Sequence, residues 1–132
     1  MSVFYKPQKF SQPGVAGGGI PQYRAAIVYR GTIYLEQIIQ DIEEMTCVHG
    51  ADVVAVVEAM RSRLGYYLSY GNIVMINGFG TFIPFIQSQT CNSFDKVDAS
   101  LIKRISIGYR PCPSLEKVLF NATFEKARKK YW

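Results

Sequence analysis

Basic side chains are the residues of this sequence whose type and spacing most clearly suggest a chemistry, the binding of phosphate groups. They form two groups near the end of the chain, and one further lysine precedes the first group. The positions are Lys96, then Lys103, Arg104 and Arg110, and finally Lys126, Arg128, Lys129 and Lys130. Where the phosphates belong to a nucleic acid, contacts with Lys and Arg do not depend on the base sequence, and they weaken strongly as the salt concentration rises. The last group has a second interpretation, as a solvated charged end.

Other chemistries find little support in the sequence. Cys47 and His49 could act as nucleophile and base, but no third group orients them, so a helix cap beside a buried thiol is favoured. One histidine and the absence of a Cys-x-x-Cys motif argue against a zinc site. The glycine-rich residues 14–19 lack the flanking strand and helix of a phosphate-binding loop. We therefore expect no catalytic residue, no metal and no cofactor.

Length and composition indicate one domain of ordinary size. The chain has 132 residues, 48% of them apolar, and a net charge of +5 that permits an anionic partner without requiring one. Three unpaired cysteines suit a reducing compartment. Neither a signal peptide nor a membrane helix is evident. We expect a cytoplasmic protein with no membrane partner and no small-molecule substrate.

The charge is unevenly distributed along the chain. Residues 1–31 contain four bases and no acid (+4), residues 32–60 contain six acids and no base (−6), and residues 101–132 contain eight bases and two acids (+6). The bases of the first segment are Lys6, Lys9, Arg24 and Arg30. The role of residues 1–22 stays open.

The first half of the chain predicts an arm, a strand and two helices. Proline and glycine in residues 1–22 predict an extended arm without a regular element. Residues 23–33 alternate as a strand, and apolar spacing predicts helices over 36–45 and 51–70. The acidic side chains of the first helix are interpreted as its solvated face. The second helix is apolar over much of its circumference, which favours a dimer.

The second half predicts three antiparallel strands over residues 73–76, 81–86 and 101–109, with a polar segment before the third. Asn77-Gly78 is a hairpin turn signal, and Ser114 is the expected cap of a short closing helix. The fold class is therefore α+β: an extra N-terminal strand, two helices, a three-stranded antiparallel sheet and a short C-terminal helix. The expected division is an extended arm (1–22), a folded domain (23–123), to which the family resemblance described next assigns DNA binding, and a basic tail (124–132).

The stretch Asn72-Ile-Val-Met-Ile-Asn-Gly-Phe-Gly-Thr-Phe82 resembles the helix-to-saddle segment of the HU/IHF family of bacterial DNA-bending proteins. The preceding helix pair, Ala99-Ser100, Tyr109-Arg110-Pro111 and the short helix at Ser114 extend this resemblance over about residues 34–122. The lead from Phe4 to Thr32 resembles the HU-like variant group of Bacteroidetes.

The resemblance implies an interlocked homodimer that binds double-stranded DNA as a histone-like, nucleoid-associated protein. In that family a saddle of two three-stranded sheets sits on DNA, and arms enter the minor groove and kink the duplex. The dimer core implied here consists of Leu64, Leu68, Phe79, Phe82 and Tyr109.

The expected arm departs from the family pattern. Residues 87–98 have no arginine, no proline and one lysine against two acids. Because minor-groove insertion depends on cations, this arm is expected to be a poor minor-groove ligand. Phe94 could act as an apolar wedge, although a partly buried loop position is the favoured interpretation. DNA contact is therefore expected at Lys103, Arg104, Arg110 and the tail.

Two hypotheses follow from these observations. The first is a dimeric, non-catalytic, architectural DNA-binding protein of low sequence specificity. The second is a structural or interaction module that keeps the HU fold but has weak or lost DNA binding.

Overall fold

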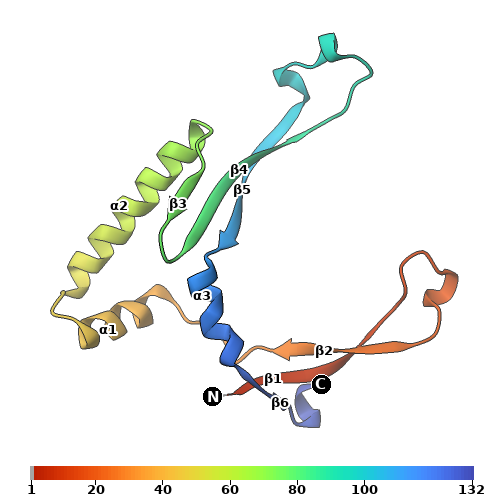
Figure 1. Ribbon diagram of the computed structural model, residues 1–132, viewed down its shortest axis with the longest axis vertical. Coiled ribbons are helices and arrows are strands. Elements are labelled where there is room, and N and C mark those ends of the chain that lie inside the picture. Colours follow the sequence, from red (N-terminus) through yellow and green to blue (C-terminus); the bar gives the residue numbers. More distant parts are fainter. Residues whose placement is uncertain (1) are drawn as a thin grey trace. The chain divides into compact units, whose positions relative to one another are not determined.

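The computed structural model describes residues 2–132, which form an α+β fold with three α-helices and two three-stranded sheets (Figure 1). The helices are α1 (Leu35–Met45), α2 (Gly50–Ser69) and α3 (Pro113–Lys117). The strands are β1 (Ser2–Phe10), β2 (Gln22–Val28), β3 (Val74–Ile76), β4 (Gly80–Ser88), β5 (Ile102–Pro111) and β6 (Thr123–Lys126).

The chain forms two compact units. Unit 1 contains the residues up to Tyr34 together with Leu119–Trp132, and unit 2 contains Leu35–Val118. This grouping differs from the division expected from the sequence, because the two ends of the chain belong to one unit. The assignment of residues 23–123 to DNA binding stays a prediction.

Unit 2 begins with the two helices that the apolar spacing predicts. His49 is the N-cap of α2, and the N–H of Gly50 donates to the carboxylate of Glu43 on α1. Glu43 therefore satisfies one of the free N–H groups at the start of α2 and is more than a solvated acid. At the other end, Gly71 has φ +83, its N–H donates to the Leu68 carbonyl, and the N–H of Asn72 donates to the Tyr67 carbonyl. This pair of bonds is a Schellman motif, which ends the helix.

The sheet of unit 2 has the strand order β3-β4-β5 and is antiparallel throughout, as predicted. Its pairing gives the sheet two chemically different faces, because paired residues share a face and neighbours along a strand alternate. Phe82 pairs with Tyr109 and Pro84 with Ile107 on one face, which we call the apolar face. The Phe82 and Tyr109 rings lie 5.2 Å apart, and the Tyr109 hydroxyl donates to the Phe79 carbonyl at 2.8 Å.

The short helix α3 begins two residues earlier than predicted. Cys112 is its N-cap and Pro113 its first residue, so Ser114 is not the cap. Proline fits the first helical position because it has no N–H to leave unpaired. The Ser114 hydroxyl lies 3.1 Å from the Cys112 sulfur, and hydrogen bonds from Ser114 lower the pKa of this thiol.

Unit 1 contains strands that the sequence interpretation missed. Its sheet has the order β2-β1-β6, with β1 antiparallel to β2 and parallel to β6. The prediction that residues 1–22 contain no regular element is wrong for β1, and the predicted tail begins within β6. The predicted strand over 23–33 is present as β2 but ends at Val28.

Pro7 does not interrupt β1, for a reason that only the pairing reveals. The Tyr5 carbonyl accepts the Ala127 N–H, so the backbone polar groups of Tyr5, and of Pro7 two residues later, point away from β2. Strand β6 pairs only as far as Tyr5, so the missing N–H of Pro7 costs no ladder bond.

Little of the described chain is buried. The buried apolar side chains among residues 2–132 are Leu68 of unit 2, which is 4% exposed, and Ala127 of unit 1, which is 8% exposed. Among residues 2–132 no helix is long and apolar enough to cross a membrane. In the same range no cluster of His, Cys, Asp and Glu side chains could hold a metal ion.

Candidate nucleic-acid interface

The first basic group lies on β5, but its members do not share one environment. Arg110 pairs with Thr81 and Arg104 with Gln87, which places both arginines on the face opposite the apolar face. The Arg104 Nε donates to the Gln87 side-chain oxygen at 2.9 Å. Lys103 lies at a β-bulge, where the register shifts beside Ser88, and is left without a paired residue.

The segment that joins β4 to β5 carries one cation, Lys96, and is held by its own acids and serine. The Ser93 hydroxyl accepts the Asp95 N–H, and the Asp98 carboxylate accepts the Ser100 N–H, each capping a short 3₁₀ turn. The Phe94 side chain is 98% exposed. The partly buried position expected for Phe94 is therefore wrong, and its ring is accessible at the end of the ribbon.

The second basic group belongs to unit 1, and two of its lysine side chains lie against aromatic rings at the end of the chain. The Lys126 Nζ lies 4.8 Å from the centre of the Trp132 ring, and the Lys130 Nζ lies 4.8 Å from that of Tyr131. The Trp132 indole N–H donates to the Ala127 carbonyl at 2.9 Å. Arg128 and Lys129 lie between these contacts in the sequence. The two predicted basic groups thus fall in different units, and each is considered separately.

The predicted dimer residues range from buried to exposed within one chain. Leu68 is buried, Leu64 and Phe82 are half-buried, and Phe79 is 60% exposed. Along the apolar face the exposed fractions of Ile86, Ile105, Ile107 and Tyr109 lie between 49% and 60%.

Four cations of unit 1, Lys6, Lys9, Arg24 and Arg30, were given no role from the sequence. Arg24 lies 5.6 Å from the centre of the Phe10 ring and Arg30 lies 4.9 Å from that of Phe4. Lys6 lies on β1 between these two aromatic residues. The acid-free composition of residues 1–31 was the available signal, but it does not identify which bases share a face.

Unit 2 thus consists of two helices followed by an antiparallel ribbon, with one apolar face and an opposite face on which Arg104 and Arg110 lie beside Ile83 and Phe85. Residues 1–126 match the family described as an HU domain fused to a wHTH, Ig or glycine-rich motif, and the chain belongs to this family. No curated protein matches the chain.

A solved structure has the same fold. It is that of a protein from Bacteroides vulgatus ATCC 8482 described as a candidate bacterial DNA-binding protein, with a TM-score of 0.66 at 12% identity. The match covers 96% of this chain and 50% of that chain, so this chain spans half the length of that protein.

Proposed function

We propose that this chain is a dimeric, non-catalytic protein that binds double-stranded DNA with low sequence specificity, at the nucleoid and in the manner of the HU-like variants of Bacteroidetes. The observation that carries the proposal is the two-faced ribbon β4–β5 within a chain of the HU family. One face is available to a second copy of the chain, and the other presents arginines to phosphate.

The dimer is supported by the apolar side chains that one chain leaves exposed. Burial of apolar area contributes about 25 cal/mol per Å², so unit 2, in which Leu68 is the one buried apolar side chain, gains little stability from its own core. A second copy placed against α2 and the apolar face would cover the predicted dimer residues and extend the core. Two such sheets would form the saddle of this family.

DNA contact by unit 2 is supported by Arg104 and Arg110, which share the face opposite the predicted dimer interface. Arginine forms bidentate hydrogen bonds with phosphate, and such contacts position a protein on DNA without reading its sequence. Phe94 supports a further role, because an exposed apolar ring at a ribbon tip has the character of a wedge between base pairs.

The alternative, an HU-fold interaction module with weak or lost DNA binding, is favoured by the charge of unit 2. Unit 2 contains seven Lys and Arg against nine Asp and Glu, a formal charge of −2. A negative unit is repelled by DNA at long range, so the arginines would have to act against its overall field.

We expect the full chain to bind a random-sequence duplex in a fluorescence anisotropy titration, with affinity falling steeply between 50 and 200 mM salt. Each phosphate contact contributes about 0.9 to the slope of log affinity against log salt. Replacing both Arg104 and Arg110 with alanine should therefore reduce the slope by about 1.8.

A matched control removes two positive charges of unit 2 outside the ribbon, with Arg61→Ala and Lys117→Ala. Arg61 pairs with Glu58 on the surface of α2, and such a pair contributes little to stability. The control should leave the slope unchanged. No binding by the unaltered chain at 50 mM salt would reject DNA binding and support the alternative module.

A further inference from the structure

The two units of the chain carry charges of opposite sign. Unit 1 contains eight Lys and Arg and one Glu, a formal charge of +7, whereas unit 2 is at −2, and together they account for the net +5. The cationic character of the protein therefore resides outside the part that contains the HU helices and the β4–β5 ribbon. An anionic partner is attracted first to unit 1.

The cations of the β1–β2 ribbon gather on one of its faces. Gln8 pairs with Arg24 and Lys6 with Ala26, so Lys6 and Arg24 share a face. Because side chains alternate along a strand, Phe10 lies on the same face, and the Arg24 guanidinium lies over its ring. The Arg24 Nε also donates to the Gln8 side-chain oxygen at 3.3 Å. Phe4, on the same face, carries Arg30, which donates to the Ser2 carbonyl at 2.8 Å. We call this surface the cationic face.

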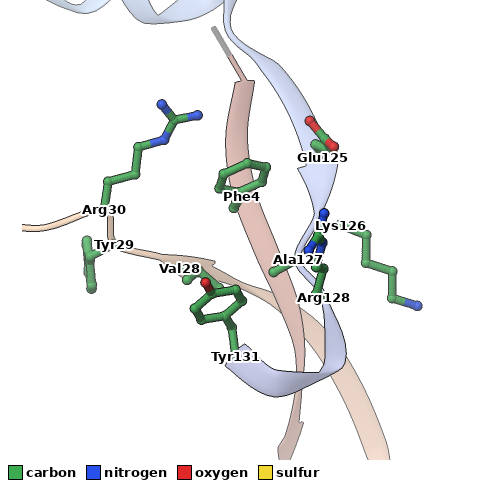
Figure 2. A pocket seen from close by; sticks show the side chains of 9 residues that line it. All are labelled: Phe4, Val28, Tyr29, Arg30, Glu125, Lys126, Ala127, Arg128 and Tyr131. Atoms are coloured by element: carbon green, nitrogen blue, oxygen red, sulfur yellow. The ribbon is translucent and has the colours of Figure 1, made fainter.

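A pocket of about 630 Å³ continues the cationic face toward β6. Figure 2 shows Phe4 between Arg30 on one side and Glu125 on the other. Lys126, Arg128 and Tyr131 line the same pocket. Lys126 pairs with Tyr5 on the other face of β1, so Arg128 is the fourth cation beside Lys6, Arg24 and Arg30. Glu125 is the one acid of unit 1, so the surface remains strongly positive even if it neutralises one neighbour.

The geometry favours the phosphate backbone of a duplex over unstacked bases as the ligand. Arginines from β2 and the segment after it already lie on the Phe4 and Phe10 rings. Each of these rings therefore already carries a guanidinium on one face, which disfavours the base stacking that single-strand binding requires. Stacking on Phe10 holds the Arg24 guanidinium plane in place, and an arginine side chain has further N–H donors that can reach phosphate oxygens.

We propose that the cationic face of unit 1, formed by Lys6, Arg24, Arg30 and Arg128, is a second DNA-binding surface that contacts the phosphate backbone of double-stranded DNA. This inference rests on the proposed DNA binding of the whole chain. It adds a site on strands β1 and β2, which precede the HU helices. From the sequence, no DNA contact is expected on these strands.

The test compares the two faces of the β1–β2 ribbon in the full chain. Lys6→Gln with Arg24→Gln removes two charges from the cationic face, whereas Lys9→Gln removes one from the opposite face, where Lys9 pairs with Tyr23. With a random-sequence duplex, the double variant should reduce the salt slope by about 1.8 and weaken binding at 100 mM salt by roughly 10- to 100-fold. The Lys9 variant should keep the slope of the unaltered chain.

Arg24→Lys is a second variant, which keeps the positive charge but removes the planar guanidinium from the Phe10 ring. It should retain the salt slope of the unaltered chain. Circular dichroism should give the same spectrum for all variants. Equal slopes for the Lys6/Arg24 variant and the unaltered chain, while the unaltered chain binds duplex, would overturn this inference and leave the proposed function intact. Equal losses in slope per charge for both faces would overturn it too, as would tighter binding of a single strand than of a duplex. Failure of the unaltered chain to bind any duplex would instead remove the proposed function.

Discussion

Replacing Gly80 with alanine is expected to lower the free energy of unfolding by more than about 3 kcal/mol, because two independent penalties meet at this position. Gly80 has φ +153, a conformation that L side chains rarely adopt. An added Cβ would collide with the Arg110 carbonyl oxygen and lie 2.8 Å from the Tyr109 ring. The oxygen belongs to the β5 backbone, so relief of the clash requires separation of β4 from β5.

Urea denaturation followed by circular dichroism measures this loss at one fixed protein concentration, since the stability of a dimer depends on concentration. Gly78→Ala is the matched control: Gly78 has φ +85, and no atom lies within 4 Å of an added Cβ. It should lose only about 1–2 kcal/mol, the cost of a left-handed conformation. Similar losses for the two variants would mean that the close approach of β4 and β5 is not what requires glycine.

Replacing Ile107 with aspartate is expected to convert the protein from a dimer to a monomer at micromolar concentration. Ile107 lies on the apolar face and is 60% exposed in the single chain, where the proposed partner would cover it. An unpaired carboxylate at that place would cost several kcal/mol on association, or on the order of 100-fold in the dissociation constant. Light scattering should give about 14.9 kDa, the mass of one chain, in place of twice that value.

Met75→Asp is the control for charge alone. Met75 is 71% exposed and pairs with Thr81, which places it on the opposite face of the same sheet. This variant should keep twice the mass of one chain at the same dilution. Retention of the dimer by the Ile107 variant would exclude the apolar face as the interface, and a monomeric unaltered chain would exclude the dimer itself.

The elements of unit 2 follow from short-range patterns, which explains why they could be predicted. The apolar spacing of α1 and α2 needs only a few turns of helix to be recognised, and Gly71 ends α2 through hydrogen bonds within five residues. The hairpin at Gly78 likewise depends on φ +85, which glycine adopts without strain.

The strands of unit 1 depend on partners at the other end of the chain. Ser2 pairs with Thr123, and their hydroxyl oxygens lie 2.9 Å apart although 121 residues separate them. Proline and glycine in the first 22 residues predict an arm without a regular element, whereas Pro7 lies within β1 and the other prolines and glycines follow that strand. The tolerance of Pro7 depends on where β6 ends, which no local pattern contains.

The candidate site divides in the same way. Composition alone identifies basic segments, because charge is a property of residues and needs no partner. Which bases share a face, and that Arg24 and Arg30 are held on Phe10 and Phe4, depend on strand register and on cross-strand neighbours. The exposure of Phe94 also depends on the surroundings of the loop, which its sequence does not describe.

The amino-acid sequence by itself determined the HU-type helices, the β3–β4 hairpin and the excess of positive charge, since each depends on residue type and local spacing. Only the tertiary structure decided that both chain ends form one sheet and that this unit carries +7 while the HU-type unit carries −2. The reason is physical: a sheet is held by hydrogen bonds between strands that can be distant in sequence, so its partners, and the charges it gathers, are set by folding of the whole chain.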